Sequence, residues 1–327
     1  MQKSQNTVRS YAHHLKLYFE FLEETGVTFL DVSMNVLAEF IGWLRRPYKS
    51  KTIVSLFEIE PRRSASTVNT IISCVISFYE YLSRSEQFHG NLSEDLFEIS
   101  TSYRKRYKEF LHHITKGIPI EKNRLKLTVP KRRIKVLSEE EISRLSNACT
   151  NIRDKLLLSV LYDGGLRISE ALSLWIEDFD IGKQSIRIRN SKTASGEGRE
   201  VFVTEQTMNL FQDYLIEVHA NEFDTNFVFV KLRGINRGQC LDYRSVESWV
   251  KRLRKKTAIN FHVHMFRHTY ATTLVRNGIS TKALQELVGH AQIQTTMDTY
   301  VHLSEKDIRE QYDTANRRAK RGGGCEK

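Results

Sequence analysis

An apolar repeat at helical spacing in the first third of the chain limits the folds available to it. Residues 7–24 read TVRSYAHHLKLYFEFLEE, and segments 33–45 and 66–83 show the same pattern. The apolar positions of the first segment lie three or four residues apart: Val8, Tyr11, Leu15, Tyr18, Leu22. This spacing places them on one face of a helix. The sequence therefore predicts a small all-helical domain, and residues 93–116 are expected to add one or two further helices.

A basic segment follows this domain. Between Lys116 and Lys135 the chain has eight Lys or Arg residues, one acidic residue and two prolines. Proline disfavours long regular structure, so we interpret the segment as an extended linker. Its charge suits a linker that crosses a DNA backbone through Lys131, Arg132 and Arg133. An ordinary solvated connector is the alternative.

The second half mixes helices with short strands. A Ser-Glu-Glu-Glu pattern at 138–141 predicts a capped helix start. A helix at 152–162 should end at the Gly164-Gly165 pair, and a short helix should follow at 168–174. Three strands are expected, separated by turn residues, around 176–179, 185–189 and 200–204. From residue 205 onward the pattern is mostly helical.

These patterns predict a mainly α protein with a small antiparallel sheet. The expected division is a helical core-binding domain at 1–117, a basic linker at 118–136 and an α+β catalytic domain with a C-terminal helix at 137–327.

The amino-acid composition limits the kinds of partner and the compartment that we expect for this chain. The 327 residues carry a net charge of +11, which favours a polyanionic partner such as nucleic acid. The four cysteines are scattered without a CxxC pair, as suits a reducing compartment. No apolar run approaches membrane-spanning length, so we expect a cytoplasmic protein with no membrane partner.

Histidine and arginine gather near the C-terminus. Five of the eleven histidines lie between His262 and His302, and Arg267 follows His264 by three residues. On a helix these two side chains share a face. An arginine fork can grip two phosphate oxygens, and a neighbouring imidazole can accept or donate a proton. The pair fits phosphodiester chemistry.

Other candidate residues lie elsewhere in the chain. Arg167 stands at a helix start after a glycine turn, where backbone N–H groups attract anions. Lys192, between two expected strands, could protonate a leaving oxygen, although exposed hairpin lysines are common. His290 follows Gly289, which should end a helix at 281–288. Tyr300 becomes a useful nucleophile only where cations favour its phenolate.

Four structural or functional alternatives compete with this interpretation. Arg167 could form an ordinary helix ion pair with Glu170, and Tyr300 could be a half-buried anchor. The histidines could bind zinc, but no cysteine is near and the HExxH glutamate is missing, so we predict no metal. The segment NGISTKALQELVGH also resembles a helix-turn-helix, which would make a non-catalytic DNA-binding regulator.

Together these segments resemble a known family. The set GGLRISEALSL, NSKTASGEGREV, HMFRHTYATTLVRNG, LVGH and TTMDTYVH resembles the tyrosine recombinase (phage integrase-like) family over residues 138–316. The N-terminal helices look like the core-binding domain of that family.

The resemblance implies roles for the candidate residues. Arg167 and Arg267 would clamp the scissile phosphate, with His264 as acid or base and His290 as a hydrogen-bonding support. Lys192 would protonate the 5′-oxygen, and Tyr300 would attack to give a 3′-phosphotyrosyl link. Glu170 would brace the site. The family mechanism uses no cofactor, neither metal nor ATP, and proceeds in a homo-tetramer on synapsed duplexes through a Holliday junction.

The amino-acid sequence of the first helix looks like that of transposon-encoded members of the family. We therefore expect a transposase or integrase of a mobile element, working on double-stranded DNA of the nucleoid, with possible accessory proteins of the same element. A Xer-like dimer resolvase is the runner-up, and a type IB topoisomerase shares the chemistry. Phosphate contacts are expected from the linker and from a second basic run: Lys251, Arg252, Arg254, Lys255, Lys256.

Overall fold

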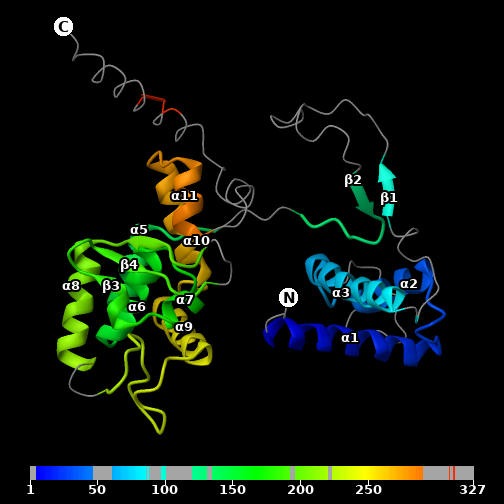
Figure 1. Cartoon of the computed structure of the whole chain (residues 1–327), viewed down its shortest axis with the longest axis horizontal. Coiled ribbons are helices and arrows are strands. Elements are labelled where there is room, and N and C mark those ends of the chain that lie inside the picture. The colour runs from blue at the N-terminus through cyan, green and yellow to red at the C-terminus, as the bar shows by residue number, and fades with distance from the viewer. Residues whose placement is uncertain are drawn as a thin grey trace. The chain divides into compact units, whose positions relative to one another are not determined.

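The structure is a computed structural model (Figure 1). It describes residues 5–46, 61–85, 87, 97–100, 120–130, 135–191, 196–219, 223–289, 309 and 312–313. Contacts divide the chain into two units, 1–132 and 133–327, and each is described by itself. No helix in the described part of the chain is both long and apolar enough to cross a membrane.

The described part of the first unit contains three helices: α1 (Gln5–Thr25), α2 (Met34–Arg45) and α3 (Ala65–Arg84). They confirm the helices predicted at 7–24, 33–45 and 66–83. Their apolar faces meet in one core, in which the Tyr18 and Tyr79 hydroxyl groups lie 2.8 Å apart and hydrogen-bond to each other. This pairing satisfies two polar groups that burial would otherwise leave without water.

The first unit also contains a strand pair. Strand β1 (Phe97–Ser100) runs antiparallel to β2 (Ile120–Asn123), with Phe97 opposite Asn123. The expectation of helix across 93–116 was therefore wrong at 97–100, and the unit is helical with a short strand pair rather than all helical. The sequence Phe-Glu-Ile-Ser alternates apolar and polar residues, which is the strand period. Residues 101–119 lie outside the described residues.

Part of the predicted linker packs on the first unit. Leu125 is buried in its core, and the Asn69 side chain donates to the Leu127 carbonyl at 2.9 Å and accepts from the Leu127 N–H at 2.8 Å. These bonds hold the segment after β2 against α3.

The second unit has more elements, and Figure 1 labels most of them. The helices are α5 (Glu139–Ala148), α6 (Ile152–Asp163), α7 (Ile168–Leu172), α8 (Glu205–Tyr214), α9 (Tyr243–Thr257), α10 (His264–Arg276) and α11 (Thr281–Val288). The strands are β3 (Phe179–Asp180), β4 (Ser185–Arg187) and β5 (Glu200–Phe202), and a 3₁₀ turn, Ile176–Asp178, precedes them. The sheet is antiparallel, as predicted, and its strand order is β3-β4-β5. Strands β4 and β5 are shorter than the predicted 185–189 and 200–204. The strand predicted around 176–179 was wrong at 176–178, because the Asp178 carboxylate accepts from the Trp175 N–H and closes a 3₁₀ turn there.

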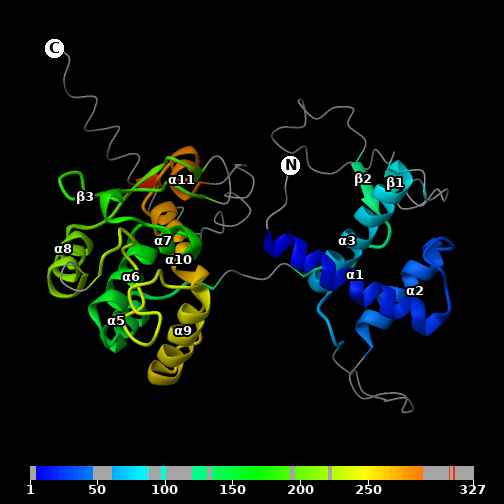
Figure 2. The ribbon, with the colours of Figure 1, turned by 60° about the horizontal axis from the view of Figure 1, so that its bottom comes forward.

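Helix α6 lies at the centre of the second unit. It packs against α8 and α10, and its leucines and valine are almost fully buried. Helix α9 packs on α5, and α11 packs on α10 (Figure 2). The capping box predicted at Ser138 and Glu141 is present and starts α5. This packing brings the end of α6, the start of α10 and the end of α11 together.

Candidate active site

A buried carboxylate organises the candidate site. Glu170 on α7 accepts from the Arg167 backbone N–H at 2.9 Å and from Arg167 Nη1 at 2.7 Å. Its Oε1 also accepts from the Ser191 hydroxyl at 2.8 Å. Arg167 is the N-cap residue of α7, and its Nη2 donates to the Gly289 carbonyl at 3.1 Å. The Arg167–Glu170 ion pair, which the sequence analysis raised as an alternative, is present, and it fixes the direction of the Arg167 side chain.

Arg199 is a second arginine on this carboxylate, and the sequence interpretation missed it. Its Nη2 lies 2.7 Å from Glu170 Oε2 and its Nη1 3.2 Å from Oε1. The same guanidinium donates to the Gly196 carbonyl at 2.8 Å and to the Leu287 carbonyl at 3.0 Å. An arginine before a short strand resembles any surface residue in sequence, so no local pattern separates Arg199 from the exposed Arg187.

The electrostatics of Glu170 follow from these contacts. Burial by itself would raise the pKa of this carboxyl, since it disfavours the charged form. The hydrogen bonds and charge of Arg199, with the Arg167 N–H and the Ser191 hydroxyl, outweigh burial and lower the pKa of Glu170 from 4.5 to about 2. Glu170 is therefore an anion at neutral pH, matched by two arginines.

Helix α10 supplies the next pair. His264 is its first residue, and Arg267 follows one turn later, as predicted. Arg267 is only 1% exposed. Its Nη1 donates to the Gly165 carbonyl at 2.9 Å, and its Nη2 donates to the Val288 carbonyl. This side chain joins the turn after α6 to the end of α11.

His264 lies within the electrostatic reach of both arginines. Burial, followed by the charges of Arg267, His262 and Arg167, lowers the pKa of His264 below its ordinary 6.5. Such an imidazole is neutral at pH 7 and can accept a proton.

The His264 and His268 rings meet edge to face, with centroids 4.5 Å apart. Burial and the neighbouring positive groups lower the pKa of His268 to about 4. Among the described residues, no group of three His, Cys, Asp or Glu side chains is placed to hold a metal ion.

Two glycines allow the backbone to approach closely at the site. Gly165 has φ +60°, and a Cβ there would lie 2.2 Å from the ring of Tyr270 on α10. Gly289 ends α11 with φ +61°, and a Cβ there would lie 2.9 Å from the Cα of Gly196. The predicted C-cap at Gly289 is confirmed. Both positions need a left-handed conformation and lack room for a side chain.

The described structure brings four predicted site residues into one region: Arg167, Glu170, His264, Arg267. Lys192, His290 and Tyr300 lie outside the described residues. Their chain neighbours Ser191 and Gly289 do belong to the cluster, through Glu170 and Arg167 respectively.

The predicted basic surface on α9 is exposed. Two of its residues are tied to backbone: Arg254 Nε donates to the Phe261 carbonyl at 2.6 Å, and Lys256 Nζ donates to the Ala148 carbonyl at 2.9 Å. The side chains of Lys251, Arg252 and Lys255 have no ion pair or hydrogen bond within the described part of the chain. The linker residues Lys131, Arg132 and Arg133 lie outside the described residues.

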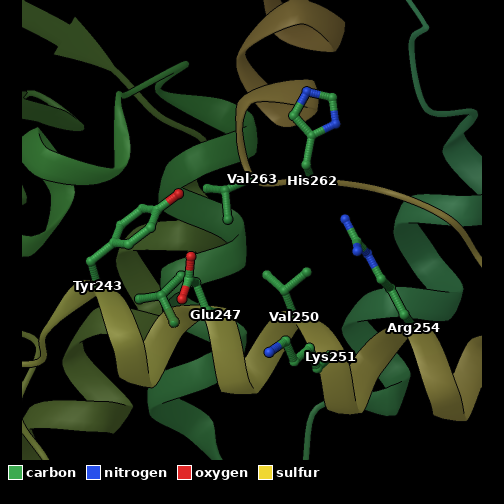
Figure 3. A pocket seen from close by; sticks show the side chains of 8 residues that line it. Tyr243, Glu247, Val250, Lys251, Arg254, His262 and Val263 are labelled. Carbon is green, nitrogen blue, oxygen red and sulfur yellow. The ribbon is translucent and has the colours of Figure 1, made fainter. Parts of the chain in front are cut away.

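A pocket of about 220 Å³ opens beside this surface (Figure 3). One side is a stripe of α9 residues that includes Tyr243, Glu247 and Lys251, and the other is His262 and Val263, just before α10. The basic helix and the two residues just before α10 therefore line the same hollow.

Comparison with known proteins identifies the family of the chain. Residues 135–307 match the Phage integrase family, and residues 1–86 match the Phage integrase, N-terminal SAM-like domain. The chain belongs to the phage integrase family. The matched regions contain all six predicted catalytic residues and most of the first unit's helices.

Individual relatives include transposon proteins. Transposase A from transposon Tn554 of Staphylococcus aureus is 39% identical over 318 residues, which cover 95% of this chain and 86% of the relative. Tyrosine recombinase XerA of Pyrococcus horikoshii is 27% identical and covers 96% of this chain and 88% of its own length.

Two solved structures share the fold of this family member. The Tn1549 transposon integrase, in complex with a circular intermediate DNA, superposes with a TM-score of 0.63 at 18% identity and covers 96% of this chain and 95% of the integrase chain. XerH site-specific recombinase, bound to a palindromic difH substrate, superposes with a TM-score of 0.64 at 20% identity. The match covers 93% of this chain and 78% of the XerH chain.

Proposed function

We propose that this chain is a site-specific tyrosine recombinase that moves a mobile element by cutting and rejoining duplex DNA. The observation that carries the proposal is the placing of Arg167, Arg267 and His264 in one region. The two arginines donate to the adjacent carbonyls of Gly289 and Val288, and the charges of both act on His264. Two arginines beside a neutral imidazole suit a phosphate whose oxygens gain negative charge during reaction. The similarity to a transposase over nearly the whole chain supports the mobile-element assignment.

The cleavage step follows from the chemistry of the side chains. The Tyr300 oxygen attacks the phosphorus and forms a 3′-phosphotyrosyl bond, while the bond to the 5′-oxygen breaks. Lys192 gives a proton to that leaving oxygen, and His264 takes the phenol proton. Arg167 and Arg267 bind the non-bridging oxygens, with His290 as a further donor. The covalent link conserves the energy of the broken bond, so rejoining needs no ATP.

A complete reaction involves further partners. We propose that four copies assemble on two synapsed duplexes and exchange strands through a Holliday junction, with accessory proteins of the element where its ends require them. The exposed lysines of α9 and the basic linker bind phosphates, and the protein works on nucleoid DNA.

Three other functions give different results in simple assays. A Xer-like resolvase would recombine a chromosomal or plasmid site rather than the ends of an element. A type IB topoisomerase would relax DNA without joining two duplexes. A non-catalytic regulator would bind DNA and keep all its function without Tyr300.

The deciding experiment looks for a covalent intermediate. The protein is incubated, in EDTA and without ATP, with duplex from the ends of its element, nicked near the cleavage point so that the cut strand diffuses away. We expect an SDS-resistant protein–DNA adduct. The Tyr300→Phe variant should form no adduct while binding the duplex as tightly as the parent.

A matched control uses another tyrosine. Tyr312 is 63% exposed, and Tyr312→Phe removes the same single oxygen. This variant should form the adduct normally. An adduct that survives Tyr300→Phe would move the nucleophile elsewhere, and the lack of any adduct on tightly bound DNA would favour the regulator.

A further inference from the structure

We propose that Arg199 is a positioning residue for proton transfer to the leaving oxygen, because it binds both the Gly196 carbonyl after Lys192 and the Glu170 carboxylate that accepts from Ser191 before it. The inference rests on the function proposed above, in which Lys192 is the general acid. It extends that function to a residue outside the predicted catalytic set.

The first observation is the shared carboxylate. Ser191, which immediately precedes Lys192, donates its hydroxyl to Glu170 Oε1 at 2.8 Å. Arg199 binds both oxygens of the same carboxylate and, through Nη1, the Gly196 carbonyl. The two ends of the short segment that contains Lys192 are thus fixed to one buried ion pair.

The second observation is close packing between these ends. A Cβ on Gly196 would lie 2.3 Å from the Ser191 hydroxyl oxygen, so the two residues are in direct contact. Backbone hydrogen bonds from Ile188 N–H to the Arg199 carbonyl and from Gly198 N–H to the Ile188 carbonyl, each 2.8 Å, continue the pairing toward the sheet. The described chain is therefore held by hydrogen bonds up to Ser191 before Lys192 and from Gly196 after it.

The third observation is the burial of the arginine. The Arg199 side chain is 7% exposed, less than the 19% of Arg167, and Glu170 is fully covered. A side chain this covered, with its donors directed at Glu170 and two carbonyls, is poorly placed to bind a DNA phosphate. Its effect on the reaction must pass through the groups that it holds.

Removing Arg199 should spare the Arg167 geometry. Glu170 would keep both bonds to Arg167, whereas the Gly196 and Leu287 carbonyls would lose their donor. The damage therefore falls on the segment with Lys192 and on the end of α11 at Leu287, and of these two effects only the first acts through protonation of the leaving oxygen. A general acid of this kind contributes about 100-fold or more to rate.

The test compares two leaving groups in single-turnover cleavage. One nicked duplex has the normal 5′-oxygen at the cleaved bond, and the other has sulfur there. A thiolate leaves without a proton, so the sulfur substrate does not need the general acid. Arg199→Met should cleave the oxygen substrate about 100-fold more slowly than the parent and the sulfur substrate less than about fivefold more slowly.

Two variants control for general damage. Arg153→Met removes another buried arginine of the same unit, one that pairs with Asp154 and the Val230 carbonyl, and should affect both substrates equally. Arg199→Lys keeps the charge but loses the fork. It should fold even if the Met variant does not. It too should lose less cleavage rate on the sulfur substrate than on the oxygen substrate, but this difference should be smaller than for Arg199→Met.

The outcomes separate the inference from the function on which it rests. If Lys192→Ala is rescued by sulfur but both Arg199 variants are not, Arg199 is structural and the inference is overturned. If sulfur rescues neither Lys192→Ala nor the Arg199 variants, Lys192 is not the general acid and the proposed mechanism falls, and the inference falls with it.

Discussion

Glu170 and Arg199 form an ion pair with almost no access to solvent, and this pair holds together segments from three parts of the catalytic unit. Arg199 Nη2 lies 2.7 Å from Glu170 Oε2, with side-chain exposures of 7% and 0%. A charged pair at this depth is stable only when both members keep their partners. The stability of the fold and the geometry of the site therefore depend on the same contact.

The pH dependence of stability should reveal this pair. The folded pKa of Glu170, about 2, lies below the ordinary 4.5, so its contribution is present above pH 4.5 and is lost as pH falls toward 2. Glu170→Gln should lower the free energy of unfolding by about 3 kcal/mol at pH 7. Denaturant unfolding of both proteins at several pH values measures the difference, which should shrink below pH 4.5. Glu140→Gln, at an exposed carboxylate of α5, should change little.

Arg167→Ala should separate cleavage from binding. Glu170 keeps Arg199 in this variant, so the fold remains while one phosphate clamp is lost. Cleavage should fall at least about 100-fold, as for other donors to a developing oxyanion. Duplex affinity, measured by gel shift, should change little because many other cations contribute. A parallel loss of binding would contradict the assignment, and Arg187→Ala on β4 serves as the exposed control.

His264 should titrate below pH 6.5. Burial and nearby positive charge disfavour its protonated form, so the imidazole is neutral at pH 7. Imidazole resonances followed by NMR from pH 5 to pH 8, with His264→Gln for assignment, measure the value directly. A pKa at or above 6.5 would show that the neighbouring arginines do not control this histidine.

Gly165→Ala should be more harmful than an alanine at another left-handed glycine. At both Gly165 and Gly234 an alanine meets strain of about 1 kcal/mol from positive φ. Only at Gly165 does the new Cβ collide with the Tyr270 ring, whereas nothing lies within 4 Å at Gly234. Thermal unfolding should show a clearly larger loss for Gly165→Ala, with lower cleavage as well. Equal losses would mean that Tyr270 moves aside easily.

The salt dependence of DNA affinity should show whether the exposed lysines of α9 contact phosphates. Lys251→Gln with Lys255→Gln should reduce the slope of log affinity against log salt by up to about 2, since each phosphate contact contributes about 0.9. Lys183→Gln, at an exposed lysine that pairs with Asp180, is the control and should leave the slope unchanged. Identical slopes for all three proteins would remove these two lysines from the DNA-binding surface.

Helix ends and glycine turns were predictable because their signals are local. Ser138 with Glu141, and Gly289 after α11, obey capping rules that depend on only a few neighbouring residues. The sequence also placed Arg167, His264 and Arg267 on their elements correctly. The roles assigned to Lys192, His290 and Tyr300 remain predictions.

Arg199 and β1 were missed because their structure depends on distant residues. Arg199 is buried only because Glu170 and the end of α11 surround it, and a lone arginine carries no sign of that. Residues 97–100 form a strand because 120–123 pair with them. Short apolar runs remain ambiguous between helix and strand until such a partner is known.

Because translation runs from the N-terminus, the two hydrogen bonds of Arg267 cannot form at the same stage of synthesis. Its guanidinium bridges Gly165, which is made long before it, and Val288, which is made after it. A growing chain that ends before α11 therefore lacks the Val288 carbonyl, which accepts a hydrogen bond from Arg267. The arginine therefore reaches its final geometry only after α11 has been translated.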